Sequence, residues 1–349
     1  MPGTDRLRDL SRLPLVAAPM AGGPSTPALV IAAAEAGALG FLAGGYKTAA
    51  DMASEIARVR SVTSEAFGVN LFVPGQATRE PEALSAYVAR LEKEAGDLGA
   101  KVGEARWDDD GYGAKLEVLL VDPPPVVSFT FGCPSTDAVK ALQAAGALVA
   151  VTVTTPDEAV LAQRAGADCL CLQGAEAGAH RGSFTNDTGP AQDHPLAALL
   201  ARVRGSSDLP LIAAGGLGSP HDVAAVLAAG ATQAQLGTAF LRCTESGAHP
   251  LYKAALADPR FSSTAITRAF SGRRARSLVN DFMRAHEDAP TAYPEVNNAT
   301  RPLRTAALAA GDVQRMSLYA GEGFRAAEQR SAGEIIERLA SGFGRSPRP

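Results

Sequence analysis

A single histidine lies among very small residues in the segment QGAEAGAHRG, residues 173–182. An apolar run ends just before this segment, and the glycines and alanines around Glu176 and His180 are too small to cover them. A neutral imidazole with an ordinary pKa of about 6.5 can accept a proton or hydrogen-bond an anion. Because small residues let a ligand approach the backbone, we predict that this loop contacts a bound molecule and that His180 is catalytic. The alternative is a structural histidine bonded to a carbonyl group.

Two further segments have the composition of a phosphate site. Residues 213–219 read AAGGLGS and residues 236–241 read LGTAFL, so both loops offer backbone N–H groups with little side-chain cover. Ser219 is a natural N-cap, which would place the positive end of a helix beside the first loop. Tight turns without a ligand are the alternative. The predicted phosphate-binding residues are Gly215, Gly216, Gly218, Gly237 and Thr238.

A flat ring with polar edges fits the other small or amide-bearing segments. PMAGG and GVNLF offer an open backbone and the carboxamide of Asn70, and Gln173 offers the same chemistry. No G-x-G-x-x-G loop indicates a second nucleotide, so one phosphate and one ring point to flavin mononucleotide, FMN. The residues predicted to bind the rest of FMN are Met20, Ala21, Gly22, Asn70, Gln173 and Gly178.

These segments follow apolar runs that alternate with helical patterns along most of the chain. The runs are continuous, as in parallel strands that are buried on both faces. Eight of them predict an α/β fold, a (β/α)8 TIM barrel whose active site lies at the C-terminal ends of the strands. An open doubly wound sheet is the alternative. The predicted strands lie within residues 13–20, 38–45, 67–74, 126–132, 148–153, 168–174, 210–216 and 233–241.

The alternation of apolar runs and helical patterns stops near residue 246. We therefore predict a barrel over residues 1–245 and a second part over residues 246–349. Helical patterns without strands between them predict helices that cap the barrel mouth and pack on the barrel. The predicted helices lie within residues 249–258, 275–286, 301–311 and 331–342.

Composition narrows the class of protein. The 349 residues carry a net charge of −4, which gives no electrostatic reason to expect nucleic acid or an anionic membrane as partner. No apolar run reaches the roughly 20 residues that span a bilayer, and the charged N-terminus does not resemble a signal peptide. Four cysteines without metal-site spacing favour a reducing cytoplasm and no metal. The sequence is compatible with a homo-oligomer.

Seven segments together resemble the nitronate monooxygenase family, formerly called 2-nitropropane dioxygenases. The resemblance implies FMN at the barrel mouth, with His180 over the reactive side of the flavin. It also implies that a small nitronate or nitroalkane reacts with O2 to give a carbonyl compound and nitrite, with His180 as base or hydrogen-bond partner. The segments are PLVAAPMAGGPS (14–25), FGVNLFVP (67–74), VVSFTFGCPS (126–135), QGAEAGAHRG (173–182), AAGGLG (213–218), LGTAFL (236–241) and TRAFSGRRAR (267–276).

One position departs from part of the family. Some members have a histidine where this chain has Thr130, and a threonine cannot act as a base near neutral pH. His180 would then carry the proton chemistry alone. The sequence leaves open the roles of Glu176 and Tyr293. Two alternative functions also stay open: a related FMN barrel reductase that uses NAD(P)H on an enoyl thioester or quinone, and a flavin-binding barrel without turnover.

Overall fold

Eight parallel strands close into a barrel in the computed structural model, which describes residues 3–189 and 192–342. Each barrel strand pairs with the next barrel strand along the chain, and the last pairs with the first. This confirms the predicted TIM barrel and all eight predicted strands. The strands are β1 (Leu15–Ala17), β2 (Leu39–Ala43), β3 (Phe67–Phe72), β4 (Val126–Thr130), β5 (Leu148–Val153), β6 (Cys169–Gln173), β8 (Leu211–Ala214) and β9 (Gln233–Leu236).

Helices surround the barrel, and most of them begin at a side chain that caps the first turn. Five of these helices follow a serine or threonine whose side chain accepts a hydrogen bond from a backbone N–H of the helix. The capping residues are Thr26, Thr48, Ser135, Thr155 and Ser219. Such caps satisfy amide groups that would otherwise have no partner. The surrounding helices are α2 (Pro27–Glu35), α3 (Ala49–Arg60), α5 (Tyr112–Val121), α6 (Thr136–Ala144), α7 (Pro156–Ala165), α8 (Leu196–Arg204) and α9 (Pro220–Ala228).

Apolar side chains fill the interior of the barrel, and α1 (Gly3–Asp9) contributes Leu7 to the same cluster. Phe41 fills the space beside Gly68, where an added Cβ would lie 2.2 Å from the ring. Cys169 and Cys171 also belong to this cluster, and burial raises the pKa of Cys171 to about 12. These two thiols are therefore neutral core residues.

The chain after residue 246 contains strands that the sequence analysis did not predict. β10 (Thr264–Thr267) and β11 (Ala275–Leu278) pair with each other, and β11 also pairs with β7 (Ala179–His180). The prediction of one helix over residues 275–286 was therefore wrong, because only α11 (Asp281–Ala285) is helical there. Pairing with the loop that carries His180 outweighs the helical spacing of this segment.

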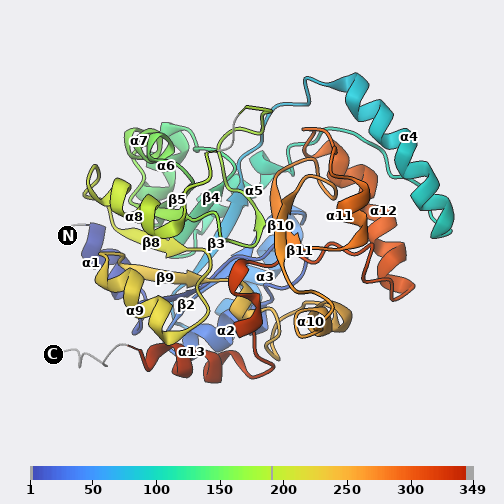
Figure 1. Cartoon of the computed structure of the whole chain (residues 1–349). Helices are drawn as coiled ribbons and strands as arrows, with labels where there is room; N and C mark the ends of the chain where they lie inside the picture. The colour runs from blue at the N-terminus through green and yellow to red at the C-terminus, as the bar shows by residue number, and fades with distance from the viewer. Residues whose placement is uncertain (1–2, 190–191, 343–349) are drawn as a thin grey trace.

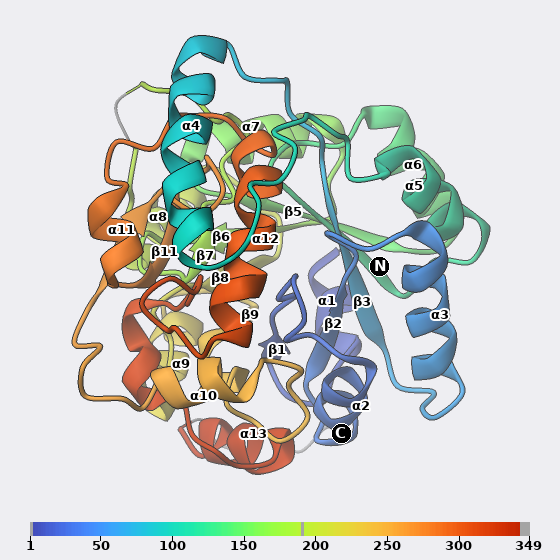
Figure 2. The ribbon, with the colours of Figure 1, turned by 90° about the vertical axis from the view of Figure 1, so that its right-hand side faces the viewer.

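Two long helices lie side by side next to the barrel. α4 (Pro81–Asp97) comes from the connection between β3 and β4, and α12 (Glu295–Ala309) comes from the C-terminal part. Figures 1 and 2 show the two helices together at one side of the molecule. Leu84, Leu91, Val296 and Leu303 join them through one buried apolar cluster.

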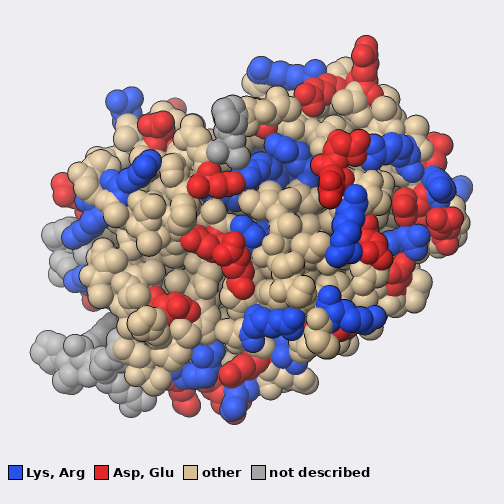
Figure 3. Space-filling view, viewed as in Figure 1, with Lys and Arg blue, Asp and Glu red and all other residues tan. Residues whose placement is uncertain are grey.

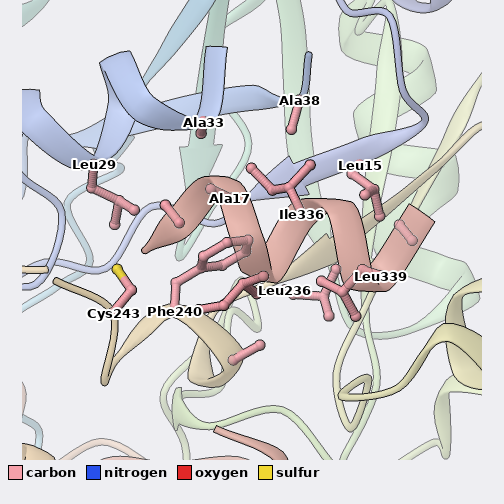
Figure 4. Packing of buried hydrophobic residues seen from close by; sticks show 14 of the residues in the cluster. Leu15, Ala17, Leu29, Ala33, Ala38, Leu236, Phe240, Cys243, Ile336 and Leu339 are labelled. Carbon is pink, nitrogen blue, oxygen red and sulfur yellow. The ribbon is translucent and has the colours of Figure 1, made fainter. Parts of the chain in front are cut away.

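The remaining C-terminal helices pack at other places. α10 (Pro250–Ala255) lies below β11 in Figure 1, and α13 (Ala332–Ala340) packs against α2 and α9. Figure 4 shows Ile336 and Leu339 of α13 among Leu15, Leu29 and Phe240. α13 therefore belongs to the outer layer of the barrel.

The surface mixes charges of both signs. Lysine, arginine, aspartate and glutamate side chains are interspersed across the face in Figure 3. Within residues 3–189 and 192–342, no helix has the length and apolar composition needed to cross a bilayer.

Candidate active site

A cavity of about 820 Å³ lies at the C-terminal ends of the barrel strands. Side chains of α12 and of the segment around Tyr319 complete its wall. Every residue predicted at the site lines this cavity except Gly218. The predicted residues that line it are Met20, Ala21, Gly22, Asn70, Gln173, Gly178, His180, Gly215, Gly216, Gly237 and Thr238.

Backbone segments meet very closely at one end of the cavity. A Cβ on Gly178 would lie 2.4 Å from the backbone nitrogen of Gly321. Gly216 has a φ of 72°, a conformation that favours glycine, and a Cβ there would lie 2.9 Å from the Cβ of Glu176. The N–H of Gly321 donates to Thr238 Oγ1 at 3.0 Å. This end of the cavity therefore consists mainly of backbone. Gly321 was not predicted to lie at the site, although the pattern G-E-G at 321–323 is similar to the other glycine-containing loops.

Gly218 lies just outside this cavity, and its amide is hydrogen-bonded to a side chain in the first turn of the following helix. Its N–H donates to Asp222 Oδ2 at 3.0 Å, and the N–H of Ser219 donates to the same oxygen at 2.8 Å. Ser219 caps α9 as predicted. Asp222 thus occupies amides at the start of α9 that the sequence analysis assigned to a phosphate.

Asn70 begins a chain of polar side chains on the floor of the cavity. Its Nδ2 donates to Ser128 Oγ at 2.9 Å and to Thr130 Oγ1 at 3.0 Å. Thr130 Oγ1 also lies 3.2 Å from Thr152 Oγ1. Both amide hydrogens of Asn70 are therefore engaged, and its carbonyl oxygen is the group left to accept a hydrogen bond. Thr130 has a place in this chain as a hydrogen-bonding group.

Gln173 holds the loop that carries His180. Its Nε2 donates to the carbonyl of His180 at 2.9 Å, and its Oε1 accepts from the N–H of Gly182 at 2.8 Å. Arg181 is buried rather than solvated, and its guanidinium donates to the carbonyl of Gly174 at 2.7 Å. The loop is therefore fixed from the end of β6 before any ligand binds.

Glu176 has a structural partner. Its carboxylate accepts a hydrogen bond from the N–H of Leu196, at 3.0 Å for Oε2, and so caps the start of α8. A carboxylate at a helix N-terminus is stabilised by the partial positive charge of that end. Glu176 therefore makes no hydrogen bond to His180.

The imidazole of His180 lies in a largely aromatic environment. Its ring centroid is 5.8 Å from that of Phe131, 5.5 Å from that of Tyr293 and 5.2 Å from that of Tyr319. His180 Nε2 lies 2.8 Å from Ser271 Oγ. Burial lowers the pKa of His180 to about 3, and the charges of Arg273 and Arg304 add to this effect. The ring is therefore neutral at physiological pH, and its pKa is far below the ordinary value assumed from the sequence.

Tyr293 packs on His180 and extends the network. Its hydroxyl lies 3.0 Å from the hydroxyl of Tyr46, which lines the cavity. The N–H of Tyr46 donates to Asp110, and Asp110 pairs with the buried Lys115 at 2.7 Å. The aspartate run at 108–110 thus supports a wall of the cavity. Within the described ranges 3–189 and 192–342, no three histidine, cysteine or acidic side chains form a metal site.

Several polar residues of the C-terminal part reach the cavity and were missed, among them Arg301, Arg304 and Tyr319. Arg301 and Arg304 both line it from α12, and their spacing of three residues on one helix face was the available signal. Arg304 hydrogen-bonds only to Asn297 and Thr300 of its own helix and has no carboxylate partner within the described residues. Tyr319 also lines the cavity, and its hydroxyl interacts with the side chain of Ser271.

Comparison with known proteins gives one consistent family. Residues 4–342 match the family model for nitronate monooxygenase. The nitronate monooxygenase of Pseudomonas aeruginosa is 40% identical over 352 residues, which cover 96% of this chain and 98% of that protein. The nitronate monooxygenase of Paraburkholderia phytofirmans is 37% identical and covers 93% and 91% of the two chains.

Solved structures agree with this result. Nitroalkane oxidase from Streptomyces ansochromogenes is 50% identical, with a TM-score of 0.93 over 97% of both chains. FabK from Thermotoga maritima is less similar, with 26% identity and a TM-score of 0.73 over 97% of this chain and 95% of that one. The chain therefore belongs to the nitronate monooxygenase family, a family of flavin-dependent oxidoreductases.

Proposed function

We propose that this enzyme uses FMN and O2 to oxidise small alkyl nitronates, such as propionate 3-nitronate, to a carbonyl compound and nitrite. The observation that carries the proposal is the neutral, half-buried imidazole of His180 in a cavity that also receives Arg304, a cation with no carboxylate partner among the described residues. A neutral hydrogen-bonding group and a free positive charge suit an anionic substrate. The names of the related proteins agree with this substrate class.

The cavity fits a flavin with one phosphate. The glycine-rich end around Gly178 and Gly216 offers backbone without side-chain cover, which suits a phosphate held by N–H groups. The free carbonyl oxygen of Asn70 can accept from an N–H on a ring edge. A volume of about 820 Å³ lies within the range of cofactor sites. When bound, FMN would supply the electron-accepting chemistry that no protein side chain here provides.

The protein itself would hold and orient the substrate. Its lowered pKa makes His180 a weaker base than an ordinary histidine for removing a proton from a neutral nitroalkane. We therefore assign it the second of the two expected roles, a hydrogen bond to a nitronate that is already formed. Gln173 positions this histidine through the carbonyl of His180, and Tyr319 offers a hydroxyl at the cavity wall.

Arg304 would attract the negative charge of the nitronate. Its charge acts on both His180 and Tyr319, so it lies close to the reacting end of the cavity. Thr300 and Asn297 hold the guanidinium through Nε and Nη2, which leaves Nη1 for a ligand. A charge held in this way costs little reorganisation when an anion binds.

Replacing Arg304 with methionine is expected to raise KM for nitronates by about tenfold, the effect of losing about 1.4 kcal/mol of binding. Arg304→Lys should recover much of the affinity because it keeps the charge. Steady-state oxygen consumption over a range of nitronate concentrations measures both. An unchanged KM in Arg304→Met would remove Arg304 from the substrate site.

Other features of the enzyme remain proposals. We propose a division into a barrel over residues 1–245 and a second part over residues 246–349, with α4 packed on the second part. The cysteines at positions 133, 169, 171 and 243 are free thiols, which supports a cytoplasmic enzyme. A homo-oligomer is compatible with this proposal.

The proposed reaction is tested by following oxygen consumption and nitrite together. Addition of propionate 3-nitronate to the FMN-loaded enzyme in air should consume oxygen and release nitrite. The neutral nitro form of the same compound should react much more slowly, because His180 is a poor base. Equal rates with both forms would refute the role assigned to His180, and no nitrite with either would refute the function.

A further inference from the structure

Arg273 is a buried cation in the turn between β10 and β11. Only 4% of its surface is exposed, and burial lowers its pKa to about 10, so it stays charged at neutral pH. Its guanidinium donates to the carbonyl of Arg181 at 3.1 Å and to the carbonyl of Ser183. No carboxylate within the described residues pairs with it directly. A charge in such a place costs free energy unless other contacts compensate for it.

One of these contacts is an aromatic ring beside His180. The Arg273 guanidinium carbon lies 4.1 Å from the ring centroid of Phe131, a distance at which a cation is attracted to the ring face. Phe131 has a φ of 76°, which is strained for a bulky residue. Its ring meets the imidazole of His180 edge-on, at 5.8 Å. Arg273 therefore contacts a residue whose backbone is strained and whose ring packs against the imidazole of His180.

A second contact runs through Ser271. Ser271 Oγ lies 2.8 Å from His180 Nε2 and also donates to the carbonyl of Arg273 at 3.2 Å. The guanidinium of Arg273 binds residues 181 and 183, which directly follow the histidine in the chain. Ser271 is thus held by the backbone of Arg273, whereas the Phe131 ring and the backbone after His180 depend on its guanidinium.

The charged and titratable groups around His180 favour its neutral form. Arg273 and Arg304 approach as cations, from the β10–β11 turn and from α12. Tyr293 and Tyr319 face the ring as phenols whose pKa burial raises, so both stay uncharged. Glu158 is the carboxylate that acts on Arg273, but it already accepts from Thr154 and Phe184. A like charge nearby disfavours protonation of an imidazole.

We propose that Arg273 is a positioning residue that fixes the imidazole of His180 and keeps it uncharged in the cavity. The proposal rests on the function proposed above, because it concerns the group that hydrogen-bonds the nitronate. The Arg273 guanidinium acts through the ring of Phe131 and through the backbone carbonyls of Arg181 and Ser183, which follow His180 in the chain. Its contacts hold the imidazole in position, and its positive charge disfavours protonation of the ring.

The test compares Arg273→Gln, which removes the charge, with Arg273→Lys, which keeps it. The matched control is Arg274→Met, because the neighbouring Arg274 side chain pairs with Asp193 instead. Histidine-ring NMR, assigned with His180→Asn, follows protonation of His180 without any substrate. Oxygen consumption with a nitronate gives kcat and KM.

We expect Arg273→Gln to lower kcat by about tenfold and to move the onset of His180 protonation up by about one pH unit. Arg273→Lys should keep the wild-type titration and recover part of kcat, and Arg274→Met should change neither. A folded Arg273→Gln protein with wild-type kcat and titration would overturn the proposal. So would a variant that loses only thermal stability.

Phe131→Leu keeps the proposal testable if Arg273→Gln does not fold. It removes the ring between the two residues and leaves the charge, so kcat should fall while the titration stays unchanged. An unchanged kcat would overturn the positioning role. If the wild-type enzyme releases no nitrite from nitronates, the proposed function fails, whereas the NMR titration still decides whether Arg273 controls the histidine.

Discussion

Replacing His180 with asparagine is expected to lower kcat/KM for a nitronate by about a hundredfold, the usual effect of losing one well-placed hydrogen-bonding group at a reacting centre. Asparagine keeps a polar side chain but cannot reach the same position between Phe131, Tyr293 and Tyr319. FMN should stay bound, because the glycine-rich end of the cavity is unchanged. Oxygen consumption measures the rate, and the visible flavin absorbance measures the bound cofactor. A variant with wild-type kcat/KM would show that His180 does not contact the nitronate.

The same variant also tests the ionisation of His180. Its folded-state pKa of about 3 lies below the unfolded value of about 6.5, so the unfolded chain binds more protons between these values. Stability from this group is therefore fully present above pH 6.5 and is lost as the pH falls, by up to about 1.4 kcal/mol per pH unit. His180→Asn should lose stability less steeply below pH 6.5. Parallel denaturation curves for the two proteins would contradict the low pKa.

Replacing Gly178 with alanine is expected to have the second largest effect. The new Cβ would lie 2.4 Å from the backbone nitrogen of Gly321, so one of the two segments must move. Overpacking of this kind costs about 1–3 kcal/mol of folding free energy. Because the same two segments lie at the proposed phosphate end of the cavity, FMN affinity should also fall by at least about tenfold. Urea denaturation and flavin titration measure the two effects.

Gly333→Ala is the matched control for this substitution. Gly333 lies in α13, and a Cβ there would meet no atom within 4 Å. Alanine in a helix is more stable than glycine by about 0.5–1 kcal/mol, so this variant should be slightly stabilised and bind FMN normally. If Gly178→Ala bound FMN as tightly as Gly333→Ala, the glycine-rich end would not be the phosphate site.

Much of the barrel could be predicted from the sequence because each buried strand is encoded by a short run of apolar residues. Continuous apolar runs such as residues 148–153 are buried along their whole length in the structure. Polar or small residues directly after such runs, including Asn70 and Gln173, gather at one end because parallel strands point the same way. The cavity-lining residues of the barrel were therefore predictable without knowledge of its packing.

The rest of the site depends on contacts between distant parts of the chain. Gly321 and Arg304 line the cavity although they lie more than a hundred residues after His180 in the chain. The sequence around them does not indicate which part of the barrel they contact. The segment 275–278 has helical spacing, yet it becomes a strand because it pairs with β7. The pKa of His180 is also a property of packing, since burial and two cations from other segments set it.

The central claim is that a nitronate, and not a nicotinamide, reduces the bound flavin. The most direct measurement mixes the FMN-loaded enzyme without oxygen with propionate 3-nitronate in one cuvette and with NADH or NADPH in another, and records the flavin spectrum. We expect the nitronate to change the spectrum, nitrite to form once air is admitted, and neither nicotinamide to bleach the flavin. Bleaching by a nicotinamide together with an inert nitronate would contradict this claim and would indicate a reductase.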